Sequence, residues 1–171
     1  MLSVQSYFMT KAIFLDRDGV INKEIGFVFK LEDFIFTGDI FPSLKKLQDA
    51  GFIFIVVTNQ SGIAKQLYKH EDVSIIHGHM LGAMKKHGII ISEIYYCPHH
   101  SDVEPCICRK PDSGMLEKAI ARFNIDVTRS FLIGDKERDI LAAEKAGVKG
   151  ILIEADSPIM GIAQQIIEKS I

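Results

Sequence analysis

The chain has 171 residues, of which 47% are hydrophobic, a length and composition typical of one domain with a sizeable buried core. Lys and Arg number 20 against 22 Asp and Glu, so the formal net charge of −2 provides no bulk field for nucleic acid or an anionic membrane. No apolar run approaches the roughly 20 residues that cross a bilayer, and residues 1–10 do not resemble a secretory signal. We therefore expect a cytoplasmic protein without a membrane or nucleic-acid partner.

Strands and helices alternate along the predicted domain, which spans residues 11–171 after a short N-terminal extension over 1–10. Short apolar runs predict buried strands, and apolar residues at helical spacing predict helices. In chain order the strands are expected at 12–16, 52–58, 89–96, 131–134 and 150–153, and the helices at 41–50, 71–87, 113–123, 137–146 and 159–171. This alternation predicts an α/β fold with a doubly wound, mainly parallel sheet. The connections are too short for a separate cap domain, so we expect an open site.

A pair of carboxylates follows the first predicted strand, in the sequence Asp16-Arg17-Asp18-Gly19-Val20. Two carboxylates on one turn can face a common point, where their repulsion favours a bound cation. Asp16 can attack phosphorus, while Asp18 can protonate the leaving oxygen and then deprotonate water. An ordinary polar turn is the alternative, because two acids at this spacing are common on their own.

Two further segments offer groups that suit phosphate. Thr58-Asn59-Gln60-Ser61-Gly62 follows the second strand, and its hydroxyls and backbone N–H groups can cradle phosphoryl oxygens. A helix cap or a plain turn would use the same residue types. Arg109 and Lys110 precede a proline and can clamp phosphate, Arg through paired hydrogen bonds and Lys as a point charge.

The fourth polar motif, Gly134-Asp135-Lys136-Glu137-Arg138-Asp139, follows another apolar run. Asp135 would complete an oxygen-rich magnesium site. Asp139 would orient the loop or hold a metal-bound water, although an acid in a first helical turn is also favoured by the helix dipole. Ligands of doubly wound sheets bind at the carboxyl ends of the strands, where these motifs are expected.

All three cysteines lie near one histidine, in the order Cys97, His99, Cys106 and Cys108. Three thiolates and one imidazole make the ligand set of a closed, tetrahedral structural zinc, and such soft ligands disfavour magnesium. A zinc loop over 97–108 would position the cations at 109 and 110 directly after the last ligand. The alternative is a set of ordinary buried cysteines beside a loop histidine.

Together, the four polar motifs resemble those of the haloacid dehalogenase superfamily of phosphatases: DRDGV from Asp16, then Thr58, Lys110 and GDKERD. The match runs from about residue 12 to residue 153, and its joint order is far more specific than any single motif. The resemblance implies a Rossmann-like fold and magnesium-dependent phosphomonoester hydrolysis through a phospho-aspartate at Asp16. It also implies that Asp18 is the acid and base and that Thr58 and Lys110 stabilise the transferring group.

Among these phosphatases the chain resembles the zinc-loop subfamily that includes D-glycero-D-manno-heptose 1,7-bisphosphate 7-phosphatases. The phrases that carry this resemblance are LDRDGVIN, VVTNQSGIA, YYCPHH, CRKP and IGDKERDILAAEKAGV. They imply a phosphorylated sugar substrate that loses its 7-phosphate, in the synthesis of ADP- or GDP-heptose for lipopolysaccharide or a related glycan. A monomer is expected.

The resemblance also implies roles for individual residues. Magnesium is expected at Asp16, Asp18 and Asp135, and zinc at Cys97, His99, Cys106 and Cys108. Substrate contacts are expected from Glu24, Ile25, Gly26, Phe27, Thr58, Asn59, Gln60, Ser61, Arg109, Lys110 and Lys136. The chain departs from the family at Glu24 and Phe27, where DxGY is usual, and at Lys65-Gln66, where Arg-Gly is common. A glycine suits special backbone angles that other residues resist.

Two alternatives remain open from the sequence. Histidinol-phosphate phosphatases share the zinc loop and the phosphate site, but Ser61-Gly62-Ile63-Ala64 resembles the heptose enzymes and the chain lacks a fused second domain. The other alternative is a zinc-stabilised binding module without turnover, although such a module would not need every acid of the motifs.

Overall fold

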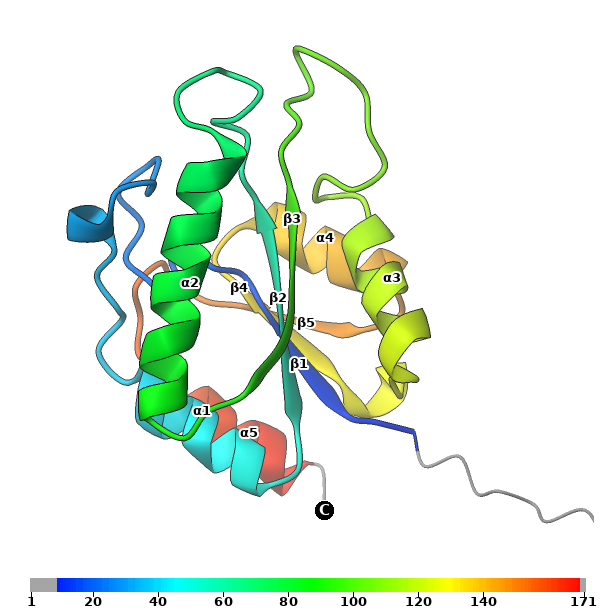
Figure 1. Cartoon of the computed structure of the whole chain (residues 1–171). Helices are drawn as coiled ribbons and strands as arrows, with labels where there is room; N and C mark the ends of the chain where they lie inside the picture. The colour runs from blue at the N-terminus through cyan, green and yellow to red at the C-terminus, as the bar shows by residue number, and fades with distance from the viewer. Residues whose placement is uncertain (1–8, 170–171) are drawn as a thin grey trace, which may run out of the picture.

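A five-stranded, entirely parallel sheet forms the centre of the protein (Figure 1). The computed structural model describes residues 9–169, so most of the predicted N-terminal extension, residues 1–8, lies outside the described residues, as do 170–171. The strands are β1 (Ala12–Leu15), β2 (Ile53–Asn59), β3 (Ile91–Cys97), β4 (Phe131–Gly134) and β5 (Lys149–Leu152), in the order β3-β2-β1-β4-β5. The predicted doubly wound parallel sheet is confirmed.

Helices cover both faces of this sheet. On one face pack α1 (Ile40–Asp49), α2 (His70–Lys86) and α5 (Met160–Glu168), and on the other pack α3 (Gly114–Phe123) and α4 (Glu137–Lys145). Two short 3-10 turns, η1 (Leu31–Asp33) and η2 (Val127–Arg129), lie in the connections. The result is a three-layer arrangement with the sheet in the middle (Figure 1).

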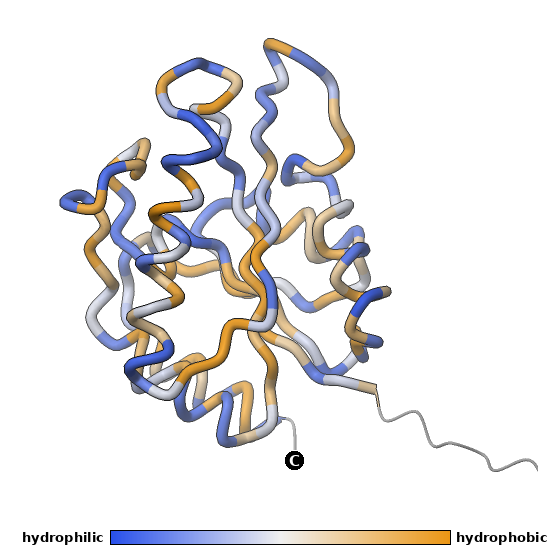
Figure 2. Tube along the Cα trace, in the orientation of Figure 1, coloured by the Kyte–Doolittle hydropathy of each residue, from blue (hydrophilic) through white to orange (hydrophobic). Residues whose placement is uncertain are grey.

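The burial of β1 explains why a continuous apolar run forms the central strand. Ile13 and Leu15 pack into the core beneath α1, α2 and α5, whereas Ala12 and Phe14 face the core beneath α3 and α4. All four residues are 0% exposed. A strand that is covered on both faces has no solvent side, so every position is apolar. Figure 2 shows this as hydrophobic colour along the central strands.

The predicted elements are present, but their ends differ by a few residues. The strand expected from residue 89 begins at Ile91, because Ile89 still belongs to the turn that ends α2. Its N–H donates to the Met84 carbonyl at 3.0 Å, and Gly88 before it has a φ of +69°. Ile89 is nevertheless buried, at 2% exposed. Because it is apolar, Ile89 is predicted from the sequence as the start of the strand, although it closes the turn after α2.

Thr10, within the predicted extension, pairs with the domain. It forms a parallel bridge with Ile125. The Thr10 N–H donates to the Asn124 carbonyl at 2.9 Å, and the Thr10 carbonyl accepts from the Asp126 N–H at 2.8 Å. The paired structure thus begins slightly before residue 11.

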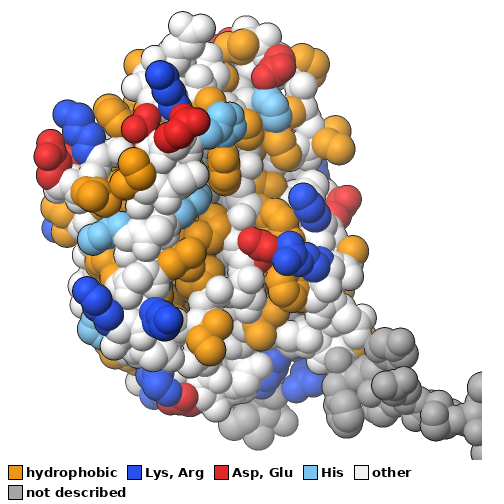
Figure 3. Space-filling model, viewed as in Figure 1, with side chains coloured by type: hydrophobic (Ala, Val, Ile, Leu, Met, Phe, Trp, Pro, Cys, Tyr) orange, Lys and Arg blue, Asp and Glu red, His pale blue; other side chains and the backbone are white. Residues whose placement is uncertain are grey.

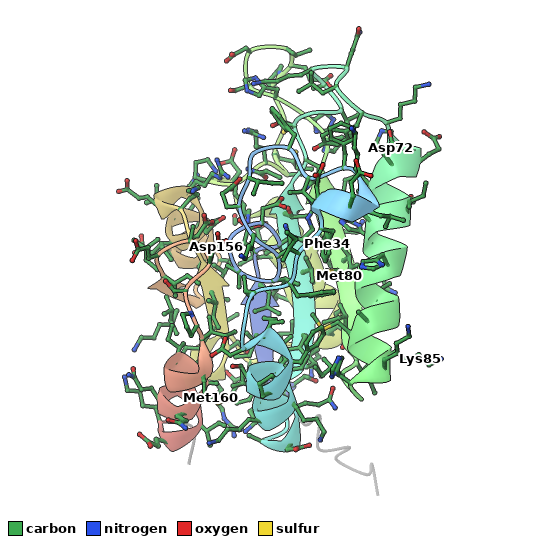
Figure 4. The ribbon with its side chains drawn as sticks, turned by 90° about the vertical axis from the view of Figure 1, so that its left-hand side faces the viewer. Phe34, Asp72, Met80, Lys85, Asp156 and Met160 are labelled. Carbon is green, nitrogen blue, oxygen red and sulfur yellow. The ribbon has the colours of Figure 1, made fainter. Side chains whose placement is uncertain are left out.

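Loops at the carboxyl edge of the sheet form the rim around the site. The segments 60–69 and 98–113 rise beyond β2 and β3 (Figure 1), and the segment 16–39 lies beside α2. Phe34 in that segment and Met80 of α2 belong to the same buried cluster, which fastens the segment to the helix (Figure 4).

The outer surface shows no single charged face in the view of Figure 3, where acidic and basic side chains are interspersed. Among residues 9–169, no helix has both the length and the apolar character that crossing a bilayer requires.

Candidate active site

The carboxyl ends of β1, β2 and β4 meet at one rim of the sheet. Asp16 follows β1, Thr58 lies at the end of β2, and Asp135 follows β4. They lie close together because β1 pairs in parallel with β2 on one side and with β4 on the other. Asp16 and Thr58 line a cavity of about 300 Å³. Motifs that are far apart in the sequence thus converge on one pocket.

Asp16 is a buried acid in this cavity, only 4% exposed. Its Oδ1 accepts from the Arg17 N–H at 2.7 Å and lies 3.1 Å from Lys110 Nζ. Burial raises the pKa of Asp16 to about 7, with Lys110 opposing the rise and Asp139 and Asp18 adding to it. A cation beside the carboxylate would favour its charged form and reverse this shift.

Lys110 is a buried cation that faces two acids. Its Nζ donates to the Val57 carbonyl at 2.7 Å and lies 2.6 Å from Asp139 Oδ1, besides its contact with Asp16. Burial opposes the charge, but Asp16 and Asp139 outweigh it and raise the pKa of Lys110. Asn59 holds the backbone in place: its Nδ2 donates to the Lys110 carbonyl and its Oδ1 accepts from the Lys110 N–H. Asn59, predicted as a substrate contact, lines the cavity and also positions this lysine.

Asp16, Asp135 and Asp139 offer carboxylate oxygens that all lie within 4.8 Å of one another. The Asp135 side chain is 0% exposed, and its Oδ1 has no hydrogen-bond partner among the residues described. Its Oδ2 lies 2.8 Å from Lys136 Nζ. Gly19, at a φ of +81°, leaves room for this acid, because a Cβ there would come within 2.6 Å of Asp135 Cγ.

These carboxylates suit a magnesium ion. A buried carboxylate oxygen without a donor carries a desolvation penalty that a bound cation can remove. Mg²⁺ prefers hard oxygen ligands and usually takes one or two carboxylates together with water and substrate oxygens. Asp16 and Asp135, both predicted magnesium ligands, therefore lie together where such an ion would be stabilised.

The Asp18 carboxylate, the other predicted magnesium ligand, lies outside this cluster. Arg17 NH2 contacts both of its oxygens, at 2.9 and 3.0 Å, and Asn22 Nδ2 donates to Oδ1 at 2.9 Å. Gln60 Nε2 donates to Oδ2 at 3.1 Å. Arg17 itself is fully buried. The side chain of Asp18 lines the cavity, and these contacts fix its orientation.

Gln60 and Tyr68 form a chain of hydrogen bonds behind the reacting groups. The Tyr68 hydroxyl donates to Gln60 Oε1 at 2.8 Å, and Gln60 Nε2 donates to Thr58 Oγ1 at 2.9 Å as well as to Asp18. Tyr68 packs against Gly62, where a Cβ would come within 2.1 Å of the ring. Tyr68 could not be predicted from the sequence, because only the folded turn after β2 brings its hydroxyl back to the strand end.

The predicted substrate loop lies at the mouth of the cavity. Glu24, Gly26 and Phe27 line it, whereas Ile25 does not and is 56% exposed. The loop is fastened from the far end of the chain, because Asp156 Oδ1 accepts from the Glu24 N–H at 2.8 Å (Figure 4).

Of the other predicted substrate contacts, some line the cavity and one does not. Ser61 and Arg109 line the cavity with Thr58, Asn59 and Gln60, whereas Lys136 pairs with Asp135. The structure also adds Val28, Lys65, Tyr68, His100 and Arg138 to the lining.

The departures from the family pattern are visible in the same region. Gln66 adopts a φ of +57°, the left-handed conformation that the glycine common in the family suits. Its neighbour Lys65 places Nζ 5.7 Å from the centre of the Phe27 ring. Two residues that differ from the family pattern therefore contact each other.

The four predicted zinc ligands come together in the loop after β3. Cys97, His99, Cys106 and Cys108 place their ligand atoms within 4.8 Å of one another. Cys97 Sγ lies 3.0 Å from Cys108 Sγ and 3.6 Å from Cys106 Sγ, and His99 Nδ1 lies 3.2 Å from Cys108 Sγ. Ligands on a tetrahedral zinc with bonds of about 2.3 Å lie roughly 3.7 Å apart, so the cluster has the size of a closed site.

Comparisons with known proteins agree with this geometry. Residues 107–157 match a family model for HAD-hydrolase-like proteins. The fold also matches the crystal structure of D,D-heptose 1,7-bisphosphate phosphatase from B. bronchiseptica, complexed with magnesium and phosphate. The TM-score is 0.85 at 28% identity, covering 94% of this chain and 99% of that one. Fold and site define a phosphatase of the haloacid dehalogenase type.

Two curated relatives narrow the class. D-glycero-alpha-D-manno-heptose-1,7-bisphosphate 7-phosphatase from Photorhabdus laumondii is 42% identical over 144 residues, 81% of this chain and 79% of that protein. D-glycero-beta-D-manno-heptose-1,7-bisphosphate 7-phosphatase from Haemophilus ducreyi is 42% identical over 145 residues, 81% of this chain and 80% of that protein. The chain therefore belongs to the haloacid dehalogenase phosphatase family that contains these heptose bisphosphate phosphatases.

Proposed function

We propose that the chain removes the 7-phosphate of D-glycero-D-manno-heptose 1,7-bisphosphate, through a phospho-aspartate at Asp16. Asp16, Asp135 and Lys110 carry this proposal, because a buried acid lies beside both a carboxylate with one unpartnered oxygen and a buried cation. Relatives at 42% identity bear the name of this activity. The cavity also has cationic side chains beyond the reacting end, which suits a sugar with a second phosphate.

We propose magnesium between Asp16 and Asp135 as the catalytic ion. When bound, it cancels charge between the Asp16 carboxylate and the incoming phosphate. Asp18 can add its main-chain oxygen, which accepts no backbone hydrogen bond within residues 9–169. Its carboxylate is then free for proton transfer. Asp139 supports two neighbouring groups and is not a proposed ligand. It pairs with Lys110, and its Oδ2 accepts from the Lys136 N–H at 3.0 Å.

The chain's own groups divide the reaction between them. Oδ1 of Asp16 is anchored by the Arg17 N–H and Lys110, so Oδ2 is the oxygen that attacks phosphorus. Asp18 protonates the oxygen of the leaving sugar and later takes a proton from the water that cleaves the phospho-aspartate. Lys110 and the Thr58 hydroxyl stabilise charge on the phosphoryl oxygens during both transfers.

We further propose that zinc closes the 97–108 loop as a structural ion. It would fix the chain directly before Arg109 and Lys110, without a part in the reaction. We also propose that the protein is a cytoplasmic monomer that acts in the synthesis of nucleotide-activated heptose.

The test is a substrate comparison with purified protein, with and without magnesium. Both anomers of heptose 1,7-bisphosphate are compared with histidinol phosphate and fructose 1,6-bisphosphate. We expect the highest kcat/KM for one heptose anomer, no turnover without magnesium, and none in a folded Asp16→Asn variant. Predominant turnover of histidinol phosphate would overturn the substrate assignment, and magnesium-independent turnover would overturn the catalytic ion.

A further inference from the structure

Three cationic side chains line the active-site cavity beyond the buried Lys110: Lys65, Arg109 and Arg138. Two of them have partners. Lys65 lies over the Phe27 ring, and Arg109 NH1 donates to the His99 carbonyl at 3.1 Å. Arg138 differs, because its Nε is buried and has no hydrogen-bond partner, and it forms no ion pair with any residue from 9 to 169.

The acids of the cavity do not supply the missing partner. Asp16 is paired with Lys110, and Asp18 is held by Arg17, Asn22 and Gln60. Glu24 Oε1 accepts from the Gly26 N–H at 2.8 Å. A guanidinium with a desolvated N–H is therefore left facing a cavity in which none of the acids pairs with it.

A guanidinium in this state is suited to an anion that arrives with the substrate. A buried N–H without an acceptor carries a penalty that a ligand oxygen removes. Arg presents several donors in a planar fork that fits a phosphate better than a sugar hydroxyl. The transferring phosphate has its own cation in Lys110, so the ligand of Arg138 is a different anionic group on the same molecule.

We propose that Arg138 binds the second phosphate of a bisphosphorylated sugar, the one that is not removed, and so makes the site prefer bisphosphates to monophosphates. The proposal deepens the proposed function and rests on it for the identity of the sugar. Because the retained phosphate remains on the product, Arg138 also slows the release of the monophosphate product.

The test measures binding to the magnesium-loaded Asp16→Asn protein, which cannot turn substrate over. Calorimetry gives dissociation constants for heptose 1,7-bisphosphate and heptose 7-phosphate, and for fructose 1,6-bisphosphate and fructose 6-phosphate. The ratio of monophosphate to bisphosphate dissociation constants is the readout, because a general loosening of the site would weaken both ligands alike. Arg138→Met removes the donors, Arg138→Lys keeps the charge, and Arg129→Met is the matched control on the exposed η2 turn.

We expect Arg138→Met to lower the ratio by about 10- to 100-fold, the size of a lost charge-assisted hydrogen bond. Arg138→Lys should give an intermediate ratio, and Arg129→Met should leave the ratio equal to that of the protein with Arg138. A ratio unchanged by Arg138→Met in both sugar pairs would overturn the proposal. Failure of the proposed function would look different: the parent protein would bind the heptose ligands weakly, and the fructose pair would still report on Arg138.

Discussion

At the scale of single residues, the Tyr68 hydroxyl controls the orientation of the proposed acid and base. It donates to Gln60 Oε1, so the Gln60 amide nitrogen is turned toward Asp18 Oδ2 and Thr58 Oγ1. A rotated amide would place its carbonyl oxygen against the Asp18 carboxylate. Burial raises the pKa of Tyr68 to about 12, which keeps the hydroxyl protonated as a donor.

We predict that Tyr68→Phe lowers kcat by about 3- to 10-fold, the effect of one hydrogen bond of roughly 1 kcal/mol. KM should change little. Steady-state kinetics across pH provide the check. Tyr95→Phe is the matched control, because the buried Tyr95 hydroxyl has no hydrogen-bond partner in the described part of the chain. Identical profiles for the two variants would contradict the positioning role.

The buried Asp16 also predicts a pH dependence of stability in magnesium-free protein. The unfolded chain releases this proton near the ordinary aspartate pKa of about 4, whereas burial raises the pKa in the folded chain to about 7. Between these values the folded state binds more protons, so the free energy of unfolding should fall as pH rises from about 4 to about 7.

Urea unfolding in zinc-containing, magnesium-free buffer measures this slope, with Asp16→Asn as the control that cannot release the proton. Added magnesium should oppose the fall, because the ion favours the charged carboxylate. A slope that is the same in the parent protein and the variant would mean that another group causes it.

At the scale of elements, the loop after β3 is joined to α3 through a glycine. A Cβ on Gly114 would come within 2.4 Å of the Ile107 carbonyl oxygen, in the backbone between Cys106 and Cys108. This contact links the cluster of Cys97, His99, Cys106 and Cys108 to the start of the helix. Because Lys110 follows the last cysteine by two residues, a shift of the loop reaches the phosphate site.

We predict that Gly114→Ala reduces bound zinc below one ion per chain and lowers kcat at least tenfold. The added Cβ would clash with a backbone carbonyl, which cannot move aside as a flexible side chain does. Metal analysis and kinetics provide the measurements. Gly78→Ala in α2 is the matched control, since nothing lies within 4 Å of its added Cβ. That change should raise the free energy of unfolding by about 0.5–1 kcal/mol. Full zinc content and normal kcat in Gly114→Ala would count against the link.

Strands and helices could be predicted from the sequence because their signals are local. Apolar runs such as β1 are buried on both faces, and the helical stripe of α2 faces the core. The motifs at the strand ends were also predictable, because each is a short local segment. Parallel pairing of the strands then brings them together at one edge of the sheet. Element ends were harder to place: Ile89 is apolar and buried, yet it seals a helix.

The supporting residues of the site could not be predicted, because their partners are distant or their roles depend on geometry. Asp156 holds the Glu24 N–H across 132 residues of sequence, and no local pattern marks that contact. Arg138 lies inside a recognised motif, but its lack of a partner is visible only in three dimensions. Asn59 was expected to touch substrate, and it also holds the backbone of Lys110.

At the scale of the whole molecule, the parallel sheet gathers Asp16, Lys110 and Asp135 from distant parts of the chain. Two helical layers bury the strands that end there, so these groups lie on a packed support while the rim loops line the cavity. Phosphoryl transfer through Asp16 requires that this support hold its carboxylate in place.

The most direct test traps the phosphorylated protein. Purified enzyme is mixed with heptose bisphosphate labelled in the 7-phosphate, quenched in acid within one turnover, and mapped by mass spectrometry. We predict a magnesium-dependent label on the peptide that contains Asp16, with none in Asp16→Asn. Phosphate release at the normal rate by Asp16→Asn, or a label on another residue, would contradict the account.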